Sequence, residues 1–191
     1  MDKIRVDFFD VLGYLIPGSA LLMVLWIGGD GKVQTIWQVY DSIHQLDNKS
    51  LLIGLLLAYI AGFVLHALGD TLYDLYRFGK IRKYAKSDVQ EKWALVREYG
   101  QKHIAILERW YALRALSQNL SAVCLVAAFA SILKLIFFHD KAWMACIAGA
   151  FVMLYIFLRR AVIFHHYLND DLDAILNLRL DALKTSTKSP G

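Results

Sequence analysis

The sequence predicts an all-α polytopic membrane protein with four transmembrane helices, both termini in the cytoplasm, and a cytoplasmic helical insert between the second and third helices. Three observations predict this class. Of the 191 residues, 58% are apolar and 20% are charged, whereas soluble domains have about 45–50% apolar and about 25% charged residues. The apolar residues gather in four runs, and the basic residues are unevenly distributed between those runs.

Each apolar run is about 17–20 residues long, which at about 1.5 Å per residue matches a hydrocarbon layer of roughly 30 Å. All four runs can therefore cross a bilayer. The first run is preceded by basic residues but leads into no signal-peptide cleavage site, so we expect it to remain as the first helix. The runs are Phe8–Ile27, Leu51–Leu68, Leu120–Phe138 and Ala142–Leu158.

The first run contains Pro17 and Gly18 near its middle. Proline has no backbone N–H and crowds the carbonyl four residues earlier, which here belongs to Gly13. We therefore expect a kink at Pro17 and Gly18. Within a membrane, a neighbouring helix or a water molecule must then satisfy the freed carbonyl.

Basic residues predict the orientation of the chain. Of the 21 Lys and Arg residues, ten lie in 70–117 and two in 28–50. Because cytoplasmic loops collect Lys and Arg, the middle segment and both termini are predicted to be cytoplasmic. The expected units are a first transmembrane pair with an outer interfacial helix containing Trp37 and Tyr40 (1–70), the cytoplasmic helical insert (71–118), a second transmembrane pair (119–160), and a cytoplasmic helical extension with a tail (161–191).

The insert at 71–118 mixes charged and aromatic residues with signals for helix ends. Gly79 is expected to end one helix, because glycine readily adopts the left-handed conformation that closes a helix. After Gly100, no glycine or proline follows until Gly149. A helix that begins near Gln101 should therefore run without a break into the third span.

The fourth span should likewise continue as one helix to Leu183, and its extension has an apolar stripe that requires a partner surface. We expect that surface to be the insert, or else a second copy of the chain. A cytoplasmic protein could also bind through 71–118 and 161–183, whereas nucleic acid is not expected because the basic residues follow the membrane topology. The stripe consists of Leu168, Leu172, Ile175, Leu176 and Leu183.

The second span has small and ionisable residues at every fourth position. Small residues allow another helix to approach closely, so the first three predict a helix-packing surface. The last three can line a pore or polar path, and His66 with Asp70 could form a proton path, a pore mouth or a metal site. Alternatively, His66 bonds only to Asp70 or to a neighbouring helix. The six residues are Gly54, Ala58, Gly62, His66, Asp70 and Asp74.

Arg160 and His165 form an RxxxxH motif directly after the fourth span, and Arg97 with His103 forms a longer variant. With four short spans and a charged insert, this layout resembles the small membrane proteins of bacterial antiviral defence loci, such as the HEPN-like membrane accessory of type VI-B CRISPR systems. The resemblance implies an inner-membrane oligomer that perturbs the membrane when infection is sensed. Ala161 stands where HEPN nucleases prefer a polar residue, so the resemblance favours a protein without enzymatic activity.

Three functions follow from these observations. The first is a non-enzymatic, homo-oligomeric sensor, effector or pore subunit of the inner membrane. The second is a small-solute or proton-coupled transporter, and the third is a membrane-tethered ribonuclease that uses Arg160 and His165. We expect no cofactor and no metal, since the sequence contains neither HExxH nor a glycine-rich phosphate loop. The ionisable candidates for transport are His66, Asp70, Asp10 and Lys134.

Overall fold

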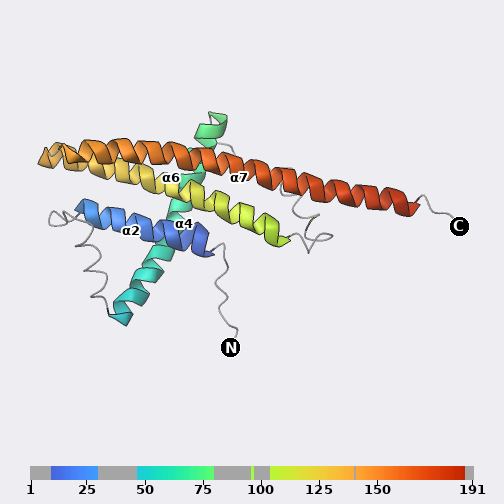
Figure 1. Ribbon diagram of the computed structural model, residues 1–191. Helices are drawn as coiled ribbons and strands as arrows, with labels where there is room; N and C mark the ends of the chain where they lie inside the picture. The colour runs from blue at the N-terminus through green and yellow to red at the C-terminus, as the bar shows by residue number, and fades with distance from the viewer. Residues whose placement is uncertain (1–9, 30–46, 80–95, 97–103, 140, 188–191) are drawn as a thin grey trace.

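The computed structural model describes residues 10–29, 47–79, 96, 104–139 and 141–187 (Figure 1). Within these residues all regular secondary structure is helical, which confirms the predicted all-α class. Four helical segments are long and apolar enough to cross a membrane. The elements are the π-helix η1 (Val11–Leu15), α2 (Ile16–Gly29), α4 (Asn48–Phe78), α6 (Ile104–Phe138) and α7 (Ala142–Thr187).

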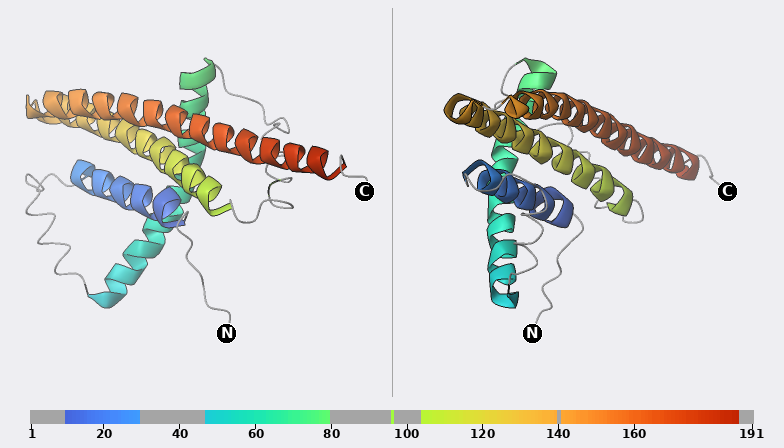
Figure 2. Two further views of the ribbon diagram at one scale, coloured as in Figure 1. Left: turned by 45° about the vertical axis from the view of Figure 1, so that its right-hand side comes forward. Right: turned by 60° about the vertical axis from the view of Figure 1, so that its left-hand side comes forward.

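Helices α6 and α7 form a long antiparallel hairpin (Figures 1 and 2). The prediction that the third and fourth spans continue as unbroken helices is confirmed, since α6 begins at Ile104 and α7 ends at Thr187. At about 1.5 Å per residue, the 35 residues of α6 measure roughly 52 Å and the 46 residues of α7 roughly 69 Å. Both helices are therefore much longer than a hydrocarbon layer of roughly 30 Å.

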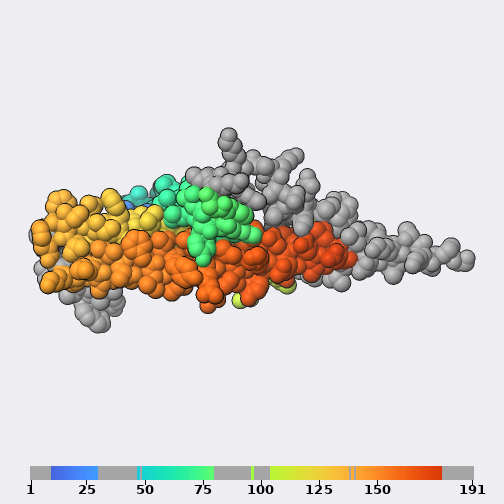
Figure 3. Space-filling model, turned by 90° about the horizontal axis from the view of Figure 1, so that it is seen from above, coloured from blue at the N-terminus to red at the C-terminus, as the bar shows by residue number. Residues whose placement is uncertain are grey.

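Helix α4 runs steeply across α2 and the hairpin, as both views in Figure 2 show. Asp47 is its N-cap, and the carboxylate of Asp47 accepts a hydrogen bond from the backbone N–H of Ser50 at 3.2 Å. It ends at Gly79, which has the left-handed φ of 64° predicted for the end of this helix. Seen from above, the end of α4 lies against α7 (Figure 3), where the rings of Tyr76 and Tyr155 are 6.3 Å apart.

The first span is disturbed where the sequence predicts a kink. The five residues of η1 form a π-helical turn, and the N–H of Ile16 bonds to the carbonyl of Val11. A π-turn is one of the known ways in which a helix accommodates a residue that breaks its regular hydrogen bonds. Pro17 and Gly18 follow the turn directly and are buried.

Some expectations lie outside the described residues, among them the interfacial helix with Trp37 and Tyr40 and the motif of Arg97 and His103. Of the insert, the structure describes 71–79, Val96 and 104–118. The helices pass through positions 70, 118 and 160 without a break. The described ends of the insert therefore extend the spans, and α4 continues through Gly69 without a break.

Two buried clusters hold the helices together. The described part of the predicted stripe packs against the insert, since Leu168 and Leu172 lie in one cluster with Val96 and Leu107, all with at most 1% exposure. The side chain of Leu183 lies outside the described ones. The indole N–H of Trp110 also donates to a carboxylate oxygen of Asp171 at 2.8 Å. In the second cluster, residues of α4 and α6 meet the first helix. Its members are Leu65, Ala122 and Val123, with Ala20, Leu21, Val24 and Leu72 packed against them.

Candidate functional site

The first helix and α4 approach each other closely at two glycines. A methyl group at Gly18 would overlap the carbonyl oxygen of Ala58, and one at Gly62 would overlap that of Tyr14. Ala58 is 1% exposed. The backbones touch because these three positions have small side chains, as in small-xxx-small packing.

The six residues predicted as one stripe do not share one face of α4. Four residues advance an α-helix by roughly 400°, so each step turns by about 40° and five steps turn by about 200°. Gly54 accordingly lies away from the packed face, and no described atom beyond its own helix lies within 4 Å of a methyl built there. Gly69 extends the packed face instead, because a methyl there would lie 2.7 Å from the carbonyl oxygen of Gln118 on α6.

Asn119 of α6 is the residue at which the helices join, and its exposure is 0%. Its side-chain NH₂ donates a hydrogen bond to the carbonyl of Gly13. This carbonyl is the one that Pro17 leaves without its helical donor. The sequence predicts that a neighbour or water must satisfy it, and in the structure the neighbour is Asn119.

Asn119 also contacts His66 on α4, with 3.3 Å between Asn119 Oδ1 and His66 Nδ1. The other ring nitrogen, Nε2, lies 3.7 Å from Oδ2 of Asp70. The side chains of His66 and Asp70 are 24% and 31% exposed. His66 and Asp70, the predicted pair, therefore lie at ion-pair distance. His66 also contacts Asn119 on α6, and Asn119 binds Gly13 in η1, so these polar residues connect three helices.

Aromatic rings border the polar residues His66 and Asp70 on the side that faces the first helix. The ring of Tyr14 packs edge-on against His66 with 5.7 Å between centroids, and against Tyr59 at 5.6 Å. The hydroxyl of Tyr59 lies 3.5 Å from a carboxylate oxygen of Asp10. Asp10 is thus connected to His66 through tyrosines rather than by direct contact.

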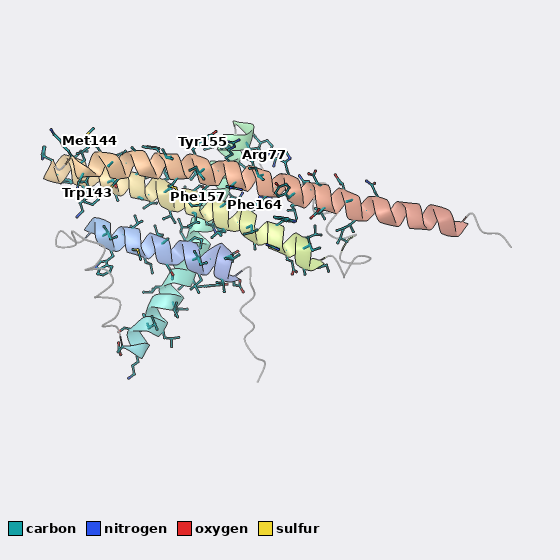
Figure 4. All side chains as sticks on the ribbon, viewed as in Figure 1. Arg77, Trp143, Met144, Tyr155, Phe157 and Phe164 are labelled. Carbon is teal, nitrogen blue, oxygen red and sulfur yellow. The ribbon has the colours of Figure 1, made fainter. Side chains whose placement is uncertain are left out.

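A second polar group lies one turn further along α4, towards α7. Tyr73 is 1% exposed, and its hydroxyl accepts a 2.6 Å hydrogen bond from Arg77. The guanidinium of Arg114 lies 4.9 Å from the centre of the Tyr73 ring. Arg114 also donates a 3.0 Å hydrogen bond to Nδ1 of His165, because an arginine side chain has no acceptor. Figure 4 labels Arg77 on α4 and Tyr155 on α7 in the region where the two helices meet.

Two buried donors remain without a hydrogen-bond partner in the described part of the chain. They are Nε of Arg114 and Nε2 of Gln118, which is 2% exposed. Asp70 interacts electrostatically with His66, Arg114 and Asp74. The site therefore combines acidic and basic groups with two unused donors, which can each bind the oxygen of an ordered water molecule.

The structure separates the two residues of the RxxxxH motif. Five residues advance α7 by about 500°, so Arg160 and His165 point roughly 140° apart. Arg160 is exposed, whereas His165 faces Arg114 on α6. Arg160 and His165 therefore lie on different sides of α7, and their use in a ribonuclease stays a prediction.

Lys134, another candidate for transport, lies far from this site. It is 8% exposed, and its Nζ is 5.8 Å from the centre of the Trp143 ring. Figure 4 places Trp143 at the turn of the hairpin. Since Lys134 follows Asn119 by 15 residues, the two lie roughly 22 Å apart along α6. Lys134 thus lies beside the turn of the hairpin and away from His66 and Asp70.

Sequence reasoning missed Asn119, Gln118 and Arg114. The signal for Gln118 and Asn119 is a polar run, SQNLS at 117–121, at the start of an apolar span, and Arg114 precedes this run by three residues. Among the described residues no group of three or more His, Cys, Asp or Glu could hold a metal ion. No known family model, no curated protein and no solved structure matches this chain.

Proposed function

We propose that this protein is an integral protein of the bacterial inner membrane that acts as a homo-oligomeric sensor, effector or pore subunit, with both termini and residues 71–118 in the cytoplasm. Four apolar helices support the membrane assignment, since at most 33% of positions in their apolar windows are buried within the chain. The remaining apolar surface needs a non-aqueous surrounding. The basic residues of 70–117 support the orientation.

The observation that carries the proposal is the connection between the hairpin extension and the first span. Leu107 packs against Leu168 and Leu172 in the extension, and Asn119 of the same unbroken helix binds Gly13 in η1. A shift of α6 at Leu107 therefore moves Asn119, which lies about 18 Å away along a rigid helix. A signal received by the extension can reach the π-turn by this route.

Assembly of several copies is supported by open small-residue positions. Gly54 on α4 and Gly149 on α7 have no described atom beyond their own helices within 4 Å of a methyl built there. Leu52 and Leu56 beside Gly54 are 70% and 60% exposed. Helices can approach closely at such positions. A role in antiviral defence rests on the resemblance of the layout alone.

Two measurements test this proposal. Light scattering of the protein in detergent should give a protein mass that is a multiple of 21.8 kDa, and a mass of 21.8 kDa at all concentrations would contradict it. A dye-release assay with liposomes should then show a different permeability for wild type and Asn119→Leu. Ser131→Ala, a buried serine elsewhere on α6, is the matched control and should behave as wild type.

A proton-coupled transporter is the second candidate, favoured by the contact of His66 with Asp70 within an apolar helix. In liposomes with an imposed pH gradient, the wild type should conduct protons and His66→Ala should not. Wild-type liposomes without proton flux would remove this candidate. Lys134→Ala is the control, because its distance from the pair predicts unchanged flux.

A further inference from the structure

The hydrogen bonds around Asn119 have only one possible direction. The carbonyl of Gly13 can only accept, so the NH₂ group of Asn119 must face it. The side-chain oxygen of Asn119 then faces Nδ1 of His66 at 3.3 Å. An amide oxygen can only accept, and therefore Nδ1 of His66 must be protonated.

Because Nδ1 of His66 carries a proton, the protonation of the other ring nitrogen, Nε2, determines how the imidazole interacts with Asp70. In neutral histidine only one ring nitrogen carries a proton, so Nε2 would present a lone pair. That lone pair would face a carboxylate oxygen at 3.7 Å. Two acceptors facing each other repel, particularly in a low-dielectric span. One proton between them removes the repulsion, whether it belongs to an imidazolium or to a protonated carboxyl.

We propose that His66 and Asp70 together bind one proton, and that Asn119 links the occupancy of this proton site to the π-turn of the first helix. The proposal rests on the proposed membrane insertion but requires neither an oligomer nor a pore. Both side chains lie partly at the surface of the chain, with 24% and 31% of their area exposed.

The groups that face the pair come from every packed element. Arg114 and Asp74 act on Asp70 with opposite signs. The phenol of Tyr14 borders His66, and Tyr111 interacts with Tyr14. His165 is held by Arg114 through Nδ1. His66 and Asp70 thus face each other between a cation, Arg114, and a carboxylate, Asp74.

Nitrogen-15 NMR of the histidine-labelled protein in lipid nanodiscs tests the site, with His66→Gln to assign the signals. Protonated and bare imidazole nitrogens have clearly separate shifts, which identify the tautomer directly. We expect Nδ1 of His66 to be protonated at every pH at which the protein is folded. A neutral His66 with a bare Nδ1 and a protonated Nε2 would overturn the proposal.

Two variants isolate the proton and its link to Asn119. In the wild type the shared proton should be found either on Nε2 of His66, by its nitrogen shift, or on the Asp70 carboxyl, by its carboxyl ¹³C shift. Asp70→Asn should remove this proton and leave Nε2 bare, and a wild type that lacks the proton on both groups would overturn the proposal. Asn119→Leu should release His66 to the opposite tautomer. Ser121→Ala, a buried α6 serine bonded to the carbonyl of Gln118, is the control and should leave His66 unchanged.

The link to the first helix has its own measurement. In protein labelled with ¹³C at glycine carbonyls, the signal of Gly13 should shift with the same pH midpoint as His66. A Gly13 signal that does not follow His66 would overturn the link while leaving the proton site intact. Failure of the oligomer or dye-release tests would leave both results standing, so the two proposals can fail separately.

Discussion

Replacement of Gly62 by alanine tests the packing of α4 on the first helix. The added methyl would overlap the carbonyl of Tyr14, a backbone atom that cannot turn away as a side chain can. The helices must separate, which for overpacked interiors typically costs about 1–3 kcal/mol. Gly54→Ala is the matched control on the same helix, since a methyl there meets no described atom beyond α4, and both variants are compared at dilutions at which the chain is monomeric in the micelles.

Both substitutions replace glycine by alanine within a helix, which stabilises the helix by about 0.5–1 kcal/mol. This stabilisation is the same for both variants and cancels when they are compared. The free energies of unfolding of Gly62→Ala and Gly54→Ala should therefore differ by about 1–3 kcal/mol, or roughly 5- to 150-fold in the unfolding equilibrium. The assay is reversible unfolding by SDS in mixed micelles, followed by circular dichroism. Equal stability of the two variants would refute the close approach at Gly62.

Three further predictions concern other elements. Asn119→Ala should lower the free energy of unfolding by about 1–3 kcal/mol in the same SDS assay, because it leaves a buried carbonyl without a donor; unchanged stability would contradict this bond. Leu172→Ala should cost about 2–5 kcal/mol, measured against Ile106→Ala, which is 51% exposed and should cost much less. Hydrogen bonds from Ser50 hold the pKa of the Asp47 carboxyl below its usual 3.8. The contribution of this cap to stability is therefore present above pH 3.8 and is lost as the pH falls through the lowered pKa of Asp47 in the folded protein. The NMR shift of the Ser50 amide should change with pH at that pKa, and should not change in Asp47→Asn.

The long helices could be predicted from the sequence because composition and breaking residues determine them locally. Apolar runs of bilayer length predicted all four helices, and Gly79 ended α4 as expected. The disturbance at Pro17 also followed from one residue, since proline lacks its N–H wherever it occurs. Such features need no knowledge of what lies beside the helix.

The partners in the site could not be predicted in the same way. The carbonyl of Gly13 needed a donor, but which of several polar residues supplies it depends on how α6 crosses the first helix. Gly54 and Gly69 show the same limit, because an interval of four residues drifts around a helix and only the crossing decides which glycine is packed. Pairs across helices are set by tertiary geometry.

The central claim is that lipid surrounds the four apolar helices. Its most direct test is flotation of membranes from cells that express the protein, after an alkaline wash that removes peripheral proteins. We expect the chain to float with the lipid and to leave it only when detergent is added. A chain that is released by the wash and remains folded in detergent-free buffer would contradict the claim.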